Sequence, residues 1–490
     1  MKRSKRSRKR HPQRRSGKKP PPAPALPLHP ALSSKGLLGK FKALLPAKLL
    51  AGWLAHAPQV FYERAFTPLI TLWYCVFQRL EPDHTMTNVM ADAHAGGADR
   101  LSPPGKPLSQ QLSSEATTSF NDARQRLPLE VFAQTLRHCG QELYSWARGT
   151  RWHGWAVALL DGSTLRLRPY EDIPEHFPPH RPGNCKKKPY WCLVRVVAAF
   201  SLATGAVLDS ALGSLQASEQ ALAAQLMKVP WLKTLFVGDR NFGVYSVVRS
   251  AQAACAQALV RLTKARAAKL AKQAGVRLVN GLDVLLSWIP SAHDQCPEGL
   301  ERTPVPGRLL VVRVQRPGFR PLTLYLFTTL TEAEKYPAAE LAQLYGQRWQ
   351  VELFLRFVKT QIDLEQLECK SADMVAKEWL AGLIAYNLVR SVMVAAAARA
   401  HIPVQILSFS RTRQVFLKWL ARWTVQPPNL SSWERLLARI ARLRHPRRRK
   451  HRPPEPRAIR DFQINFPKLE GDRATARKSL KLANARASKS

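Results

Sequence analysis

The sequence predicts an α/β protein whose β-rich core lies between helical regions. Apolar residues recur with helical spacing in residues 36–146. From Trp155 onward, apolar runs rich in β-branched residues alternate with helical ones, and helical spacing dominates again from Ala338 to Arg444. A period of about 3.6 residues indicates a helix, and short β-branched runs bounded by turns indicate strands. The chain is therefore expected to form helices, then a mixed sheet, then helices.

The first 35 residues predict an arm without regular structure. Residues 1–20 carry eleven Lys or Arg, and residues 20–30 carry six Pro. This composition is typical of a disordered basic arm on a stiff linker, or of a tail that is merely solvated or used in targeting. Three amphipathic segments then predict a helical N-terminal domain: Leu37–Leu54, Phe66–Leu80 and Leu129–Trp146.

Three consecutive strands are predicted after Trp155. The second and third are joined by the turn Ala203-Thr204-Gly205. Helices then alternate with strands, so the predicted order is β-β-β-α-β-α-β. The segments are, in order, Ala156–Leu160, Tyr190–Ser201, Ala206–Leu212, Ser218–Lys228, Thr234–Val237, Gly243–Ala256 and Leu259–Leu262.

The second half of the chain returns from strands to helices. Residues 275–330 predict strands separated by Pro and Gly: Val284–Ile289, Leu309–Gln315 and Leu322–Thr328. One long helix is predicted over Ala338–Leu367, and residues 377–444 are also predicted to be helical. A second basic tail begins at Pro446.

The charge balance favours a polyanionic partner. The chain has 76 Lys and Arg against 34 Asp and Glu, a formal net charge of 76 − 34 = +42 over 490 residues. Self-repulsion of this size opposes compaction unless a polyanion screens it, so nucleic acid is favoured over an acidic protein or a small metabolite. Hydrophobic residues make up 45% of the chain, which excludes a wholly disordered basic protein.

The cysteines and apolar runs predict the cellular compartment of the protein. Seven Cys are scattered without a CxxC pair, which fits a reducing compartment and argues against a zinc ribbon. No apolar run is predicted to reach the roughly 20 residues of a membrane span. The basic start leads into prolines, where a secretory signal has an apolar segment. We therefore expect a cytoplasmic, nucleoid-associated protein with no membrane partner.

Two acidic residues, Asp161 and Asp239, directly follow apolar runs that predict strands. One Asp in such a place is most simply a turn residue. Two of them, separated by a β-β-α crossover, indicate a shared site. Other acids of this region lie in loops or turns and are expected to be structural: Asp172, Asp209 and Asp294.

The predicted long helix carries a third acid within a polar stripe. At about 100° per residue, four residues share a face about 60° wide: Tyr345, Arg348, Glu352 and Lys359. A phenol and two cations thus flank a carboxylate over roughly 21 Å. The alternative is a solvated face on which Arg348 and Glu352 pair at i, i+4, a contact worth only about 0.3 to 0.5 kcal/mol.

The spacing Tyr-x2-Arg-x3-Glu-x6-Lys resembles, without a gap, the YREK signature of bacterial insertion-sequence transposases of family four, which are cut-and-paste DDE enzymes. Residues 161–167 resemble that family's first-aspartate motif, and residues 237–240 resemble its second. Residues 66–69 and 387–390 are similar to its N- and C-terminal parts. The resemblance covers about residues 50–455 and leaves out the basic, Pro-rich start.

This resemblance implies a fold class: an RNase H-like catalytic core, a mixed sheet with flanking helices, interrupted by a β-rich insertion. Helical N- and C-terminal regions complete it. The implied divisions are a disordered basic arm (1–35), a helical DNA-binding domain (36–150), the first part of the core (151–265), the β insertion (266–332), the second part of the core with the YREK helix (333–375), a helical C-terminal region (376–445) and a basic tail (446–490).

The resemblance also implies the chemistry. Cutting a phosphodiester and joining the freed 3′ hydroxyl to target DNA needs charge neutralised at two oxygens, which two Mg²⁺ ions can supply, with Mn²⁺ as a substitute. Asp161, Asp239 and Glu352 would be the catalytic carboxylates and metal ligands, with Asp161 bridging both ions. The rest of the stripe would contact DNA phosphates: Tyr345, Arg348 and Lys359.

Nearby aromatic and basic residues have further implied roles. In relatives that cut the second strand through a DNA hairpin, a flipped base stacks on Trp, and Trp349 matches one such position. Trp288 is the candidate for the other position, or else a core residue of its strand. The lysines after the first strand either face DNA or form a merely solvated charged run: Lys186, Lys187 and Lys188.

The sequence therefore predicts a Mg²⁺-dependent transposase that binds double-stranded DNA, both terminal inverted repeats and target, as a homodimer in a synaptic complex. Two alternatives stay open. One is another RNase H-like nuclease such as a junction resolvase, which has no use for the β insertion or the YREK stripe. The other is an inactive, transposase-derived nucleoid protein, which has no reason to keep three acids in order.

Overall fold

The computed structural model describes residues 33–45, 47–55, 65–146, 150–179, 191–314, 322–423 and 429–445, and then 472, 474–475 and 478–479. The chain forms two units, residues 1–445 and 446–490, and the first contains the sheet and its helices. Nearly all of the predicted basic arm and C-terminal tail lie outside the described residues, and so do Lys186, Lys187 and Lys188.

Residues before the core form the helical region that their apolar periodicity predicts. Thr67 begins one helix and Thr85 another, each accepting a hydrogen bond from a backbone N–H of the first turn. The elements are α1 (Ser34–Lys42), α2 (Ala47–Leu54), α3 (Pro68–Leu80), α4 (Met86–His94), η1 (Asp99–Leu101), α5 (Leu108–Gln111), α6 (Thr118–Arg126) and α7 (Leu129–Ser145).

A mixed sheet follows, and in the described residues it has nine strands. Its order is β3-β2-β1-β4-β5-β8-β7-β6, with β9 paired to the end of β1. The strands are β1 (Ala156–Leu167), β2 (Cys192–Ser201), β3 (Val207–Ser214), β4 (Thr234–Gly238), β5 (Gln257–Arg261), β6 (Asp283–Trp288), β7 (Val305–Val314), β8 (Leu322–Thr328) and β9 (Gln366–Leu367). Antiparallel β1 to β3 and parallel β4 and β5 confirm the predicted RNase H-like order.

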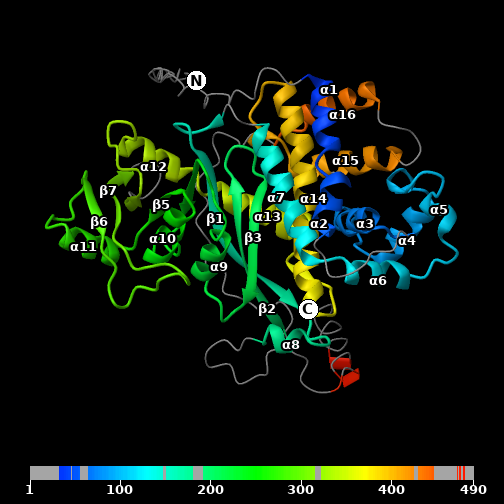
Figure 1. Ribbon diagram of the computed structural model, residues 1–490, viewed down its shortest axis with the longest axis horizontal. Coiled ribbons are helices and arrows are strands. Elements are labelled where there is room, and N and C mark those ends of the chain that lie inside the picture. Colours follow the sequence, from blue (N-terminus) through cyan, green and yellow to red (C-terminus); the bar gives the residue numbers. More distant parts are fainter. Residues whose placement is uncertain are drawn as a thin grey trace, which may run out of the picture. The chain divides into compact units, whose positions relative to one another are not determined.

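The predicted β insertion continues this sheet. β8 pairs antiparallel with β5, and β7 and β6 extend the sheet beyond it (Figure 1). The helices between the strands are α8 (Ile173–His176), α9 (Glu219–Leu226), α10 (Tyr245–Ala253), α11 (Lys264–Gln273), α12 (Ala338–Gly346) and α13 (Gln350–Gln361). The sequence analysis did not predict α11, although Thr263 caps it and strong helix formers fill it.

Strand β1 is longer than predicted. The predicted strand ends at Leu160, where the apolar run stops and Asp161 and the small or polar residues Gly162, Ser163 and Thr164 begin. They pair instead with β2 in an unbroken antiparallel register, from Ala158 to Leu167. Cross-strand pairing has overridden local propensity, so Asp161 lies within a strand and not after one.

The predicted helix over 338–367 is also wrong, because it divides into α12, α13 and β9. Between α12 and α13 the backbone N–H groups of Gln347 and Arg348 donate to carbonyls three residues back, and those of Gln350 and Val351 do the same. Bonds of this kind make a tighter turn than an α-helix. The rotation of about 100° per residue, which places four polar residues on one helix face in the sequence analysis, therefore does not hold across this junction.

Alternate residues of β1 face two separate parts of the core. Val157 and Leu159 pack in a large cluster with the N- and C-terminal helices. Ala158 and Leu160 pack in a second cluster with α9, α10 and α11. Since side chains alternate along a strand, Asp161 belongs to the first face, the side that α13 contacts.

Contrary to the sequence analysis, one helix is long and apolar enough to cross a membrane. This helix, α14 (Ala372–Arg399), has its 18-residue apolar window wholly buried inside the protein. It contacts α3 and α7 and the remaining C-terminal helices (Figure 1). These are α15 (Phe409–Trp423) and α16 (Leu430–Arg442), which follow η3 (Val404–Ile406). Asn387 exchanges two hydrogen bonds of 2.8 Å with the backbone of Val207. The apolar character of α14 thus belongs to the protein core.

Candidate active site

The parallel strands β1 and β4 bring Asp161 and Asp239 together. Leu159 lies opposite Val237 in their register, and each Asp follows two residues later, Asp161 within β1 and Asp239 directly after β4. β4 ends at Gly238, and among the described strands none pairs with β1 on this side until β9 meets Arg166. We call this uncovered edge of β1, residues 160–165, the notch. Asp161 lies in it, with Asp239 at its border.

Helix α13 is held beside the notch at both ends. Before it, the tight turn after α12 begins at Gly346. After it, β9 pairs with β1, and the Arg166 N–H donates to the Glu365 carbonyl at 3.0 Å. α13 itself contacts β1. A third acid, Glu352 in the first turn of α13, is thereby brought to the two strand acids.

The four stripe residues lie around the notch, although they do not occupy one continuous helix. Arg348 donates to Glu352 at 2.7 Å, and its side chain is 15% exposed against 57% for Glu352. Tyr345 is buried at the end of α12. Lys359 lies 3.8 Å from Glu365. The Arg348–Glu352 pair at i, i+4 that the sequence analysis left as an alternative is present, but its guanidinium is mostly buried.

An open cavity of about 340 Å³ lies between the notch and α13. Asp161 from β1 lines it on one side, and Glu352 and Lys359 from α13 line it on the other. The remaining lining residues are Leu355, Arg356, Thr360 and Glu365. The cavity thus combines carboxylates with cations, as a site for a metal-bound phosphodiester requires.

The carboxyl of Asp161 has a pKa well above its usual range. Burial raises its pKa from 3.8 to about 6. Arg348 and a hydrogen bond from the Gly162 N–H act against this rise, whereas the negative charges of Asp239 and Glu352 add to it. Mutual repulsion shows that the three carboxylates share one electrostatic environment. A cation placed among them would relieve both the repulsion and the cost of burial.

The donor set suits a hard divalent cation, since carboxylate oxygens are the ligands that Mg²⁺ prefers. Among the described residues, however, no group of three or more His, Cys, Asp or Glu side chains is placed to hold a metal ion. Asp239 accepts from the Asn241 N–H at 2.8 Å, and Glu352 accepts from Arg348. Asp239 can keep this bond on Oδ1 and offer Oδ2 to an ion, whereas Glu352 must turn at least one oxygen from Arg348 toward it.

We expect Asp161→Asn to stabilise the metal-free protein at about pH 8 but not at about pH 4. The folded-state pKa of Asp161 is raised, so the free energy of unfolding falls as the pH rises from about 4 to about 6. Asn does not titrate, and the gap between variant and wild type should grow over this window to about 3 kcal/mol. Urea unfolding in a chelator at several pH values measures it. A gap that does not change with pH would contradict the shift.

The two tryptophans occupy different environments. Trp349 is 49% exposed at the junction of α12 and α13, beside Arg348 in the chain. Trp288 is 3% exposed and packs edge-on against Phe327 with ring centroids 5.0 Å apart. Trp288 thus takes the core alternative that the sequence analysis left open. Trp349 alone of the pair offers a ring face to a base.

Arg261 is a site residue that the sequence analysis missed. In the register of β4 and β5, Val237 lies opposite Leu259, so Arg261 is level with Asp239 and on the same face. Arg261 and Arg348 both act against the rise that burial causes in the pKa of Tyr345. Within the described residues, the buried Nε of Arg261 has no hydrogen-bond partner. A charged residue directly after the apolar run 258–260 was the available signal.

The acids expected to be structural have structural partners. Asp209 is buried and accepts from Arg137 at 2.9 Å. Asp172 accepts from the backbone of Ala372 at the start of α14. Asp294 accepts from Ser291 twice, at 2.8 Å each. Contrary to the predicted loop or turn, Asp209 lies within β3 and ties this strand to α7, whereas Asp172 and Asp294 fix a helix start and a loop. Within the described chain, the three acids at the notch remain as the set drawn from β1, the end of β4 and α13.

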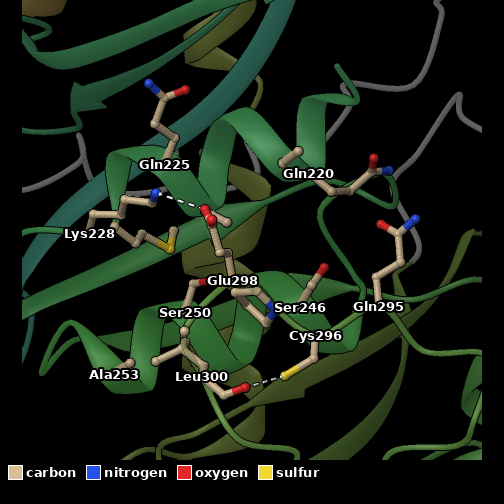
Figure 2. Close-up of a pocket in the computed structure, with 15 residues that line it drawn as sticks. Gln220, Gln225, Lys228, Ser246, Ser250, Ala253, Gln295, Cys296, Glu298 and Leu300 are labelled. Carbon is tan, nitrogen blue, oxygen red and sulfur yellow. Dashed lines mark hydrogen bonds and ion pairs between the residues drawn. The ribbon is translucent and has the colours of Figure 1, made fainter. Parts of the chain in front are cut away.

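A larger cavity of about 820 Å³ lies between α9, α10 and residues 295–300 (Figure 2). Figure 2 shows Lys228 reaching across it to Glu298 and the Cys296 thiol donating to the Leu300 carbonyl. None of the three acids is among its described lining residues. The smaller cavity, which carries charge of both signs beside Asp161, is therefore the better candidate for the chemistry.

Comparison with known proteins agrees with this geometry. Residues 152–388 match the family model described as a transposase DDE domain. The chain is 26% identical over 391 residues to the transposase InsG for insertion sequence element IS4 of Escherichia coli strain K12, a match that covers 77% of this chain and 81% of that protein. Among solved structures it is similar to a piggyBac transposase synaptic complex with hairpin DNA, at 11% identity, a TM-score of 0.37, and 82% and 85% coverage of the two chains. The resemblance to insertion-sequence transposases is confirmed: the chain contains a transposase DDE domain and is a distant homologue of the IS4 transposase over most of its length.

Proposed function

We propose that this protein cuts the ends of its insertion sequence and joins the freed 3′ hydroxyls to target DNA, using two divalent ions, Mg²⁺ or Mn²⁺. The observation that carries the proposal is the meeting of Asp161, Asp239 and Glu352 at the notch, from two strands and a helix that are far apart in sequence. Ions held there would neutralise charge on the attacking and leaving oxygens.

The chain's own residues would then position the DNA. Arg348 is mostly buried beside the acids, so its guanidinium is held in place to bind a phosphate near the break. Lys359 lines the same cavity and would hold the next phosphate as a point charge. Tyr345 and Arg261 lie on the Asp239 side and would contact the strand there. These roles require Arg348 to release Glu352 when metal and DNA arrive.

The wider assembly belongs to the same proposal. The basic charge of +42 suits binding to the terminal repeats and to target DNA. We place DNA recognition in the helical N-terminal region, and we propose a homodimer that holds two ends in one complex. The domain divisions given above, the DNA-facing role of the lysines at 186–188 and a cytoplasmic, nucleoid-associated location are part of it.

Excision from a plasmid tests this function in cells. A marked copy of the insertion sequence, supplied with the wild-type protein, should be lost from the donor and recovered in a target. The same assay with Asp161→Ala reports background. Equal recovery with both proteins would contradict transposase activity in this chain.

We expect Trp349→Ala to slow a later step more than the first. Its half-exposed ring can stack a flipped base, and a stack of this kind is worth about 1 to 3 kcal/mol. First-strand nicking needs no flipped base, so hairpin formation or resolution should suffer most. Timed assays of nicked, hairpin and fully cut products on end-labelled DNA separate the steps.

Trp288→Phe is the matched control, because Trp288 is a core residue and Phe keeps most of its packing. Equal slowing of nicking and hairpin steps in Trp349→Ala would remove the stacking role. Absence of any hairpin product in the wild type would show that the second strand is cut by another route.

A further inference from the structure

The loop after Asp239 is tied to the first turn of α9. Asn241 donates its backbone N–H to Asp239 Oδ1 at 2.8 Å and its side-chain amide to Glu219 Oε2. Gln220 donates its Nε2 to the carbonyl of Asn241 at 3.0 Å and to its Oδ1 at 2.6 Å. Ser218 caps the same helix by accepting from the Ala221 N–H. The carboxylate of Asp239 is thus connected to Glu219 through one residue.

Glu219 also touches the strand that carries Asp161. A Cβ built on Gly162 would lie 2.5 Å from Glu219 Cδ and 2.6 Å from its Oε1. A methyl group at position 162 would therefore force the Glu219 side chain to move from its present position. Gly162 faces the α9 side of the sheet, since side chains alternate and Asp161 faces the α13 side. Glu219 therefore lies behind the notch, on the opposite face from Glu352.

We propose that Glu219 is a positioning residue that sets the spacing of Asp161 and Asp239 from behind the sheet. The inference rests on the proposed function in that it takes these two acids to be metal ligands. Glu219 packs against Gly162 on one side and holds Asn241 on the other, so one carboxylate touches the neighbours of both acids. Outer groups that orient ligands in this way commonly affect metal affinity about 10- to 100-fold.

The role requires a hydrogen-bond acceptor of the right length and does not require a negative charge. Gln at 219 can present the same oxygen to the Asn241 amide, whereas Ala cannot. The two substitutions therefore separate positioning from direct metal binding. Gln225→Ala is a matched control, because Gln225 is an exposed residue of the same helix and lines the larger cavity (Figure 2).

The experiment measures Mn²⁺ binding to the full-length protein by electron paramagnetic resonance and, in parallel, cleavage at graded Mg²⁺. We expect Glu219→Ala to weaken Mn²⁺ binding about 10- to 100-fold. The Mg²⁺ concentration for half-maximal cleavage should rise with it, while the rate at saturating metal changes less. Glu219→Gln and Gln225→Ala should stay close to wild type. Gly162→Ala places a methyl group against the Glu219 side chain, displaces it, and should weaken Mn²⁺ binding too.

Two results would overturn the positioning role. Wild-type Mn²⁺ binding in folded Glu219→Ala and Gly162→Ala would show that the contact does not set the site. A Glu219→Gln protein as weak as Glu219→Ala would show that the charge is needed, as for a direct ligand. Asp161→Ala separates this inference from the proposed function: if Asp161→Ala binds Mn²⁺ like wild type, the metal site itself is misplaced. Should Glu219→Ala fail to fold, Glu219→Gln and Gly162→Ala still decide the question.

Discussion

Removing any one of the three acids is expected to abolish DNA cleavage while leaving DNA binding largely intact. Asp161→Ala, Asp239→Ala and Glu352→Ala each delete a proposed metal ligand and no phosphate contact. Most of the affinity for DNA comes from Lys and Arg on phosphates, which these substitutions leave in place. Gel shifts on terminal-repeat DNA measure binding, and end-labelled substrate with Mg²⁺ measures cleavage for each variant.

Asp294→Ala is the control for this series, since Asp294 holds a loop of the β insertion through Ser291. It should cleave like wild type once its folding has been checked. Substantial cleavage by any of the three acid variants would take that residue out of the site. Loss of DNA binding in all three would instead point to a folding defect or to a site used only for binding.

The second large effect is expected for Arg348→Ala. If Arg348 only pairs with Glu352 on a solvated face, its loss costs well under about 1 kcal/mol of stability and leaves activity unchanged. If it holds a phosphate beside the break, cleavage should fall about 10²- to 10³-fold in a folded protein. Its positive charge also lowers the pKa of Asp161, so the acid limb of the pH–rate profile should move to higher pH in the variant.

Arg435→Ala is the matched control for an arginine in an exposed helical pair, because Arg435 donates to Ser431 at i, i−4 on α16. Lys359→Ala tests the stripe independently, since Lys359 pairs with Glu365 and not with Glu352. It should impair end processing as Arg348→Ala does. If folded Arg348→Ala and Lys359→Ala both process ends at the wild-type rate, these two residues form only surface ion pairs and do not hold DNA.

Local sequence was enough to predict most strands and which three acids lie near one another. The run 322–328 is a strand with the predicted bounds, and Asp239 follows β4 as expected. The setting of Asp161 could not be predicted locally. Gly162 and its neighbours have turn propensity, and only pairing with β2 across 30 to 40 residues of chain makes them a strand.

Features that depend on tertiary packing could not be predicted from the sequence. Arg261 lies beside Asp239 only because of the register between β4 and β5. Hydrophobic periodicity within a strand gives no information about register between strands. The sequence matches Trp349 to a base-stacking position but leaves Trp288 open between stacking and the core, and only the packing against Phe327 places Trp288 in the core. The break between α12 and α13 had one local signal, Gly346, in an otherwise continuous helical pattern.

Cleavage of the element's own ends by the purified wild-type protein is the direct test of transposase activity. Terminal-repeat DNA labelled at either strand is incubated with the protein in Mg²⁺, in Mn²⁺ or in a chelator. We expect cuts at the repeat ends that leave 3′ hydroxyls, require the divalent ion and disappear in Asp161→Ala. Tight binding to the repeats with no cut in either metal would contradict transposase activity and indicate an inactive, transposase-derived DNA-binding protein. Cutting only at branched junctions would contradict it as well, in favour of a resolvase-like nuclease.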